Sequence, residues 1–155
     1  MPSPTPRPLD GRPVAVGHVG VNVVDLDRSV AFYRDVIGLD VIAVTEGRFA
    51  FCGLGETLAV TLWQQAAADH ATDRAGLHHL AFELADVAAL DAAASRLRAA
   101  GIELVHDGVV AHAEGADSGG IFFHDPDGTR LELYVTAGLA GAHAPSGEAP
   151  TCGFF

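Results

Sequence analysis

The feature that most constrains the fold of this chain is an internal repeat. The segment Gly17–Asp25 resembles His78–Asp86 at an offset of 61 residues. In each copy a histidine, His18 or His79, stands seven residues before the closing aspartate. A repeat of this length indicates that the chain is built from two copies of one supersecondary unit.

Each repeat ends on an aspartate that opens a helical pattern. Asp25 and Asp86 are predicted N-caps, because a carboxylate accepts hydrogen bonds from the free N–H groups of a first helical turn. Apolar residues at helical spacing predict helices over residues 26–37 and 87–100. A glycine follows each of them and fits the left-handed position beyond a helix end.

Three strand patterns follow each helix, separated by turns rich in glycine or in Asp-Pro. The predicted strands are residues 40–45, 48–53, 58–64, 102–107, 120–124 and 130–136. Together with the strand inside each repeat, each half therefore reads β-α-β-β-β. The fold class is α+β, and the unit is a single domain of two such modules.

We expect this domain to span residues 15–136, because both ends of the chain lack the periodicity of its middle. The first module covers about 15–65 and the second about 76–136, joined by a linker at 66–75. A Pro-rich tail of residues 1–14 precedes the domain, and a C-terminal tail of residues 137–155 follows it.

The charge of the chain excludes several kinds of partner. Its 155 residues include nine Arg, no Lys and twenty acids, giving a net charge of −11. Nucleic acids and anionic membranes need clustered Lys and Arg, so we expect neither as a partner. No apolar run reaches the roughly 18 residues of a membrane span, and the Pro-rich N-terminus has no signal-peptide pattern. We therefore expect a cytoplasmic protein that binds a small molecule.

Strand parity separates the histidines. Alternate residues of a strand face opposite sides of a sheet, so the apolar side of each predicted strand covers a helix and leaves an open face. His18, His79 and Glu132 fall on the open face, whereas His78 falls on the helix face. Two imidazoles and a carboxylate from three strands can bind one divalent Fe, Ni, Co, Mn or Zn ion with open positions. A hydrogen-bonded structural role for the same side chains stays open on parity alone.

These patterns resemble the vicinal oxygen chelate superfamily, which includes glyoxalase I, methylmalonyl-CoA epimerase, extradiol dioxygenases, fosfomycin-modifying thiol transferases and bleomycin resistance proteins. The resemblance is carried by the strand–helix pattern of residues 18–39, the His-Leu-Ala-Phe of 79–82 and the Phe-His-Asp-Pro-Asp-Gly-Thr-Arg-Leu-Glu-Leu of 123–133. It implies paired modules whose sheets curl around a metal-binding cup, with the same two His and the Glu as ligands. It also implies a homodimer.

The resemblance further implies an enzyme that binds the adjacent oxygens of a small substrate to its metal, by dioxygenation, isomerisation or a lyase step. In glyoxalase I a carboxylate or amide stands on the fourth strand, where this chain offers Ala59, Thr61 and Trp63. Phe122 stands where the dioxygenase pattern has a Tyr. The alternative is a metal-free binding protein of the bleomycin-resistance type. The acidic charge of this chain suits binding of a cationic antibiotic, but such a protein has no need of the two His and the Glu as metal ligands.

Other side chains on the open faces are candidates for catalysis and substrate binding. His112 and His124 are candidate general bases because imidazole titrates near neutral pH, and Glu83 is a third. Parity also places Cys52 on the open face. The expected substrate pocket consists of Asn22, Thr61, Trp63, Phe122, Arg130 and Tyr134.

Overall fold

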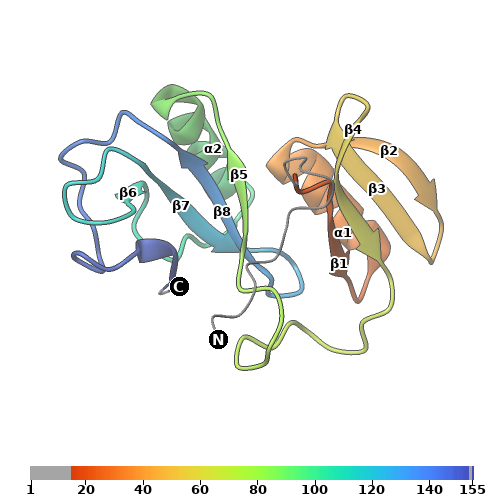
Figure 1. Ribbon diagram of the computed structural model, residues 1–155. Helices are drawn as coiled ribbons and strands as arrows, with labels where there is room; N and C mark the ends of the chain where they lie inside the picture. Colours follow the sequence, from red (N-terminus) through yellow and green to blue (C-terminus); the bar gives the residue numbers. More distant parts are fainter. Residues whose placement is uncertain (1–14, 154) are drawn as a thin grey trace, which may run out of the picture.

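A computed structural model describes residues 15–153 and 155, which form two four-stranded sheets with one helix on each (Figure 1). The expected Pro-rich tail of residues 1–14 lies outside the described residues. In chain order the elements are β1 (Val19–Asn22), α1 (Leu26–Phe32), η2 (Tyr33–Ile37), β2 (Asp40–Thr45), β3 (Phe49–Leu54), β4 (Thr57–Trp63), β5 (Leu80–Glu83), α2 (Val87–Ala99), β6 (Val110–Ala111), β7 (Gly119–His124), β8 (Arg130–Val135) and η3 (Thr151–Gly153).

The two sheets have the same topology. Their strand orders are β1-β4-β3-β2 and β5-β8-β7-β6. In each sheet the first strand pairs in parallel with the last, and the remaining pairs are antiparallel. The predicted α+β fold of two β-α-β-β-β modules is therefore confirmed. Within the described residues, no helix is long and apolar enough to cross a membrane.

Both predicted helix starts are confirmed by their caps. The Asp25 carboxylate accepts a hydrogen bond from Arg28 N at 2.9 Å, and the Asp86 carboxylate accepts one from Ala89 N at 2.8 Å. The first helix departs from expectation after Phe32, because its remaining turn, η2, is a π-helix. The spacing of apolar residues does not distinguish this π-helical turn from an α-helical one, because a single π turn keeps the chain helical.

The strand expected at 102–107 is wrong. Ile102 and Leu104 alternate inward and pack against the core, which reproduces a strand pattern in the sequence. Instead of a strand, the structure has an irregular segment here, which donates a hydrogen bond from Val105 N to Phe122 O at 2.8 Å. The edge strand of this sheet is the two-residue β6, which follows the segment.

The expected placement of Cys52 is also wrong. Cys52 and Ala50 are fully buried and pair with Val60 and Leu62, the core-facing residues of β4. These small side chains lie on the sheet face that α1 covers, and the larger aromatic residues of β3 face the other way. The parity assignment failed because it gave the buried face to the bulkier apolar residues.

One hydrophobic core joins the two modules. The buried side chains of both sheets and both helices form a single cluster, and the rings of Phe32 in α1 and Phe123 in β7 lie 6.5 Å apart. The helix-covered face of each sheet therefore contributes to a shared interior. In the part of the chain that the structure describes, no α-helix packs on the opposite face of either sheet, and we call these the open faces.

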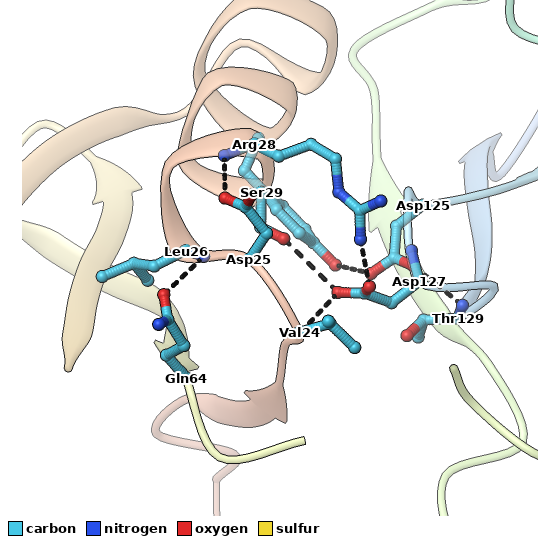
Figure 2. A network of polar contacts seen from close by, with 10 residues as sticks. Val24, Asp25, Leu26, Arg28, Ser29, Gln64, Asp125, Asp127 and Thr129 are labelled. Atoms are coloured by element: carbon cyan, nitrogen blue, oxygen red, sulfur yellow. Dashed lines mark hydrogen bonds and ion pairs between the residues drawn. The ribbon is translucent and has the colours of Figure 1, made fainter. Parts of the chain in front are cut away.

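A polar network also fastens the modules together (Figure 2). Asp127, in the turn between β7 and β8, accepts hydrogen bonds from Val24 N at 3.1 Å and from the Ser29 hydroxyl at 3.5 Å. It also forms an ion pair with Arg28. Because these three donors surround the start of α1, the turn of the second module holds the first module in place.

Asp125, in the same turn, binds a buried residue of η2. Its carboxylate accepts a hydrogen bond from the Tyr33 hydroxyl at 3.0 Å, and from Asp127 N and Thr129 N at 3.0 and 2.8 Å. Burial raises the pKa of the Asp125 carboxyl, while the hydrogen bonds from Thr129 and Tyr33 lower it, and burial has the larger effect.

The Asp125→Asn variant tests this balance. Folded Asp125 takes up its proton at a higher pH than the unfolded chain does, so its contribution to stability grows as the pH falls. We expect the free energy of unfolding of the wild type, relative to Asp125→Asn, to rise as the pH is lowered from neutral toward the ordinary carboxyl pKa of about 4. Urea unfolding of both proteins across this range measures the difference, and a fall in the relative stability of the wild type would contradict the prediction.

Candidate metal centre

The open face of the second sheet is centred on Glu132. This residue lies in β8 and its side chain is buried, with 3% of the residue exposed. His112 Nε2 lies 2.6 Å from Glu132 Oε1, and His79 Nε2 lies 3.6 Å from Glu132 Oε2. The two imidazoles therefore lie next to different oxygens of the Glu132 carboxylate.

The distances distinguish a ligand pair from a hydrogen bond. Two donor atoms that each lie about 2.1 Å from one tetrahedral ion are roughly 3.4 Å apart. The 3.6 Å between His79 Nε2 and Glu132 Oε2 fits such a pair. The 2.6 Å between His112 Nε2 and Glu132 Oε1 is a hydrogen-bond distance, because it is too short for two atoms bound to one metal.

His79 stands directly before β5 and is half-buried. Burial of the ring lowers the pKa of His79, and this effect exceeds the opposite influence of Glu132. A lowered pKa keeps an imidazole neutral, which is the form that binds a metal ion. The chemistry of the His79 and Glu132 donors therefore fits a divalent cation.

The third expected ligand, His18, lies elsewhere. It is exposed and stands directly before β1, at the start of the first sheet. Across residues 15–153 and 155, no group of three His, Cys, Asp or Glu side chains is arranged to hold a metal ion. One copy of the chain thus brings two of the expected ligands together and leaves the third on its other module.

The C-terminal segment covers the face that holds Glu132. The ring of Phe155 lies 4.7 Å from that of Phe122, 5.9 Å from His79 and 6.3 Å from His124. The guanidinium of Arg130 lies 5.8 Å from the centre of the same ring. Aromatic and cationic groups therefore enclose the candidate site from above the sheet.

The three expected catalytic residues, Glu83, His124 and His112, differ in how they lie relative to the ligand pair. Exposed Glu83 accepts a hydrogen bond from the Tyr134 hydroxyl at 3.2 Å, and the Tyr134 ring lies 6.0 Å from that of His112. His124 is exposed at the end of β7, and partial burial of its ring lowers the pKa of His124. His112 is the one of the three that bonds to Glu132.

The remaining expected pocket residues gather on the first sheet. Trp63 Nε1 donates a hydrogen bond to Thr61 Oγ1 at 3.0 Å, and the Trp63 ring lies 5.2 Å from Phe49. Phe51 stacks on Phe49 at 5.1 Å. Beside this aromatic cluster is a shallow, open depression of about 440 Å³, lined by Gly20, Asn22, Trp63 and Gln65.

The expected pocket is thus divided between the open faces of two sheets. The polar candidates around Glu132 lie on the second sheet, and the aromatic cluster with Asn22 lies on the first.

Comparisons with known proteins identify the family. The family model of the Glyoxalase/Bleomycin resistance protein/Dioxygenase superfamily matches residues 15–133. The chain belongs to this superfamily. The match covers both modules and includes the segments that carry His18, His79 and Glu132.

Curated members of the superfamily show what the chain is similar to. It is 34% identical over 146 residues to the 2-epi-5-epi-valiolone epimerase of Actinomyces sp, covering 77% of this chain and 78% of that protein. It is 30% identical over 122 residues to the catechol-2,3-dioxygenase of Bacillus subtilis, covering 77% and 41% respectively. The chain therefore spans about two fifths of the length of that dioxygenase.

Solved structures of the superfamily share the fold. Lactoylglutathione lyase from Agrobacterium tumefaciens is 26% identical with a TM-score of 0.61, over 79% of this chain and 94% of that one. A glyoxalase/dioxygenase from Nostoc punctiforme is 23% identical with a TM-score of 0.69, over 88% and 100%. The second likeness concerns the fold alone.

Two residues of the candidate metal centre, Ser118 and Gly120, were not predicted from the sequence. Ser118 accompanies His112, with the Ser118 hydroxyl 2.9 Å from His112 Nδ1, and no sequence pattern links them. Gly120 lies beside the carboxylate, because a Cβ there would stand 2.5 Å from Leu133 O and 3.2 Å from Glu132 Oε1. A glycine pair at the start of a strand was the available signal, since glycine in a strand marks a close approach.

Proposed function

We propose that this superfamily member is a divalent-metal enzyme whose site is shared between two copies of the chain. His79 and Glu132 of one copy would hold the ion together with His18 of the other. The observation that carries the proposal is the 3.6 Å separation of His79 Nε2 and Glu132 Oε2, on a face that His18 of the same chain does not reach by any hydrogen bond or ion pair within the described residues.

The packing inside one copy supports a shared site. The helix-covered faces of both sheets belong to the common core, and the C-terminal segment lies over the second open face near Glu132. A second copy would therefore pack against the first open face and against the surface formed by the second open face with this segment. A two-fold axis that sets the first sheet of one copy against the second sheet of the other would complete two identical sites at once. The aromatic cluster of Trp63, Phe49 and Phe51 would then lie opposite the ligands.

We propose proton-transfer chemistry, an epimerisation or isomerisation, on a small molecule with oxygens on adjacent atoms. A divalent ion held by these ligands would supply Lewis acidity to the oxygens of the substrate. Support comes from the epimerase relative, the curated one of comparable length reported above, and from Phe122, which has no hydroxyl for the proton transfer expected of a dioxygenase.

The residues of the chain have separate roles in this chemistry. We assign proton exchange with the substrate to the Tyr134–Glu83 pair, because their hydroxyl and carboxylate are hydrogen-bonded to each other at 3.2 Å on this face. Phe155, whose ring packs on the fully buried Phe122, would exclude water from the ligands and offer a flat surface to the substrate. With no Lys and a net charge of −11, the chain favours a neutral or cationic substrate over an anionic one.

A mixing experiment tests the shared site. We expect about one cobalt or zinc ion per wild-type chain and none in His18→Ala or Glu132→Ala alone. When the two variants are unfolded and refolded together, half of the dimers combine an intact His18 with an intact His79 and Glu132. Metal analysis should then recover about one ion per four chains. His143→Ala, which changes an exposed histidine, serves as the control.

The outcomes separate the alternatives. Metal in the wild type without recovery in the mixture would assign the site to a single chain. No metal in the wild type, even after incubation with cobalt, would overturn the enzyme proposal and favour a metal-free binding protein. A screen of cationic antibiotics would then be the next measurement.

A further inference from the structure

We infer that His112 is a positioning residue, which holds one oxygen of Glu132 so that the other alone faces the metal. This inference rests on the proposed function. It assigns His112 a role other than the general base expected from its residue type, and it concerns how the carboxylate binds the ion.

The role of Glu132 as a metal ligand decides which atom carries the shared hydrogen. A carboxylate binds a metal in its ionised form, which only accepts hydrogen bonds. In the proposed site His112 Nε2 is therefore the donor of the hydrogen that it shares with Glu132 Oε1 at 2.6 Å. A nitrogen that carries hydrogen has no lone pair in the ring plane to offer a metal, so His112 is excluded as a ligand while this bond exists.

The backbone around His112 holds the ring in place. His112 N donates to Ser118 O at 3.0 Å, and Thr151 N donates to His112 O at 2.6 Å. The Ser118 hydroxyl lies 2.9 Å from His112 Nδ1, at the far side of the ring. The Ser118 hydroxyl and Glu132 therefore hold the two ring nitrogens, while Ser118 O and Thr151 N hold the backbone of His112, as is usual for groups that orient a metal ligand.

The consequence is a carboxylate that binds through one oxygen. With Oε1 engaged by His112, Glu132 presents Oε2 toward His79. A carboxylate that used both oxygens would occupy two positions on the ion. Binding through Oε2 alone leaves one more position open, which a substrate with two adjacent oxygens requires.

The test uses cobalt, whose visible absorption weakens as its coordination number rises. We expect His112→Ala to bind cobalt at least ten-fold more weakly than the wild type, measured by equilibrium dialysis, since outer partners of metal ligands contribute about 10–100-fold. We also expect weaker visible bands per bound ion, because Oε1 becomes free to coordinate. His112→Gln keeps an N–H donor and should restore most of both properties.

Two further variants keep the test decisive. Ser118→Ala removes the contact to Nδ1 without touching the sheet and should shift cobalt affinity in the same direction by a smaller factor. His143→Gln changes an exposed histidine and should match the wild type in affinity and spectrum. Unfolding curves confirm that each protein is folded before cobalt is added.

The results separate this inference from the proposed function. Cobalt binding by the wild type with unchanged affinity and spectrum in His112→Ala would overturn the positioning role alone. Weaker affinity with an unchanged spectrum, not restored by His112→Gln, would assign His112 to the structure and also overturn the inference. No cobalt binding by the wild type would overturn both.

Discussion

Replacing Asp127 by alanine should lower the free energy of unfolding by about 3 kcal/mol. The Asp127 side chain is 2% exposed and accepts hydrogen bonds from Val24 N and the Ser29 hydroxyl, besides its ion pair with Arg28. The variant leaves the buried Ser29 hydroxyl and the partly buried Val24 N–H without this acceptor and removes the ion pair, and a buried donor without a partner costs about 1–3 kcal/mol. Because a domain is stable by only about 5–15 kcal/mol, this is a large fraction of the total.

Urea denaturation followed by circular dichroism measures the loss. Asp127→Asn keeps one acceptor oxygen and should lose about 1 kcal/mol, since the charge is removed but the hydrogen bonds can persist. Asp69→Ala, in an exposed part of the segment between the modules, is the matched control. A change below 1 kcal/mol in Asp127→Ala would mean that the shared hydrophobic core and the Tyr33–Asp125 hydrogen bond hold the modules together without the Asp127 contacts.

Gly120→Ala should destabilise the second sheet by about 3 kcal/mol, at the upper end of what overpacking costs. An added Cβ would lie 2.5 Å from Leu133 O and 3.1 Å from Tyr134 Cβ, both on the paired strand β8. The two strands must separate to admit it. Since the same Cβ would stand 3.2 Å from Glu132 Oε1, cobalt affinity should fall together with stability.

Gly76→Ala provides the comparison, because a Cβ at Gly76 meets no atom within 4 Å. It should change neither the unfolding midpoint nor cobalt binding. If Gly120→Ala loses stability but keeps its cobalt affinity, the carboxylate tolerates the displacement of β8, and the close packing at Gly120 serves the fold alone.

The fold could be predicted because its signals are local. The capping aspartates and the alternation of β8 each depend on residues a few positions apart, and the repeat presents the same short pattern twice, 61 residues apart. These signals predict that Glu132 and His79 lie on one face. The strand predicted at residues 102–107 and the face predicted for Cys52 were wrong for a non-local reason. Burial at these positions depends on which helix covers which side chain, and short sequence patterns do not show this.

The details of the candidate site depend on contacts between distant residues. His112 meets Glu132 across twenty positions, and Phe155 reaches His79 from the end of the chain. Neither contact produces a periodic pattern in the sequence from which it could be predicted. His112 was found as a chemically suitable residue, but its partner, which decides what it can do, came only from the structure.

The turn that carries Asp125 and Asp127 also decides which half of the chain meets which. At the 61-residue offset of the repeat, Arg28 and Ser29 correspond to Ala89 and Leu90, which offer Asp127 no donor side chain. A tandem of two second modules would therefore bury that carboxylate without its ion pair, and a tandem of two first modules would lack it. The two halves have the same fold, but the Asp127 contacts form only between a first module and a second module. The sequence therefore favours packing of the two different halves of one chain against each other.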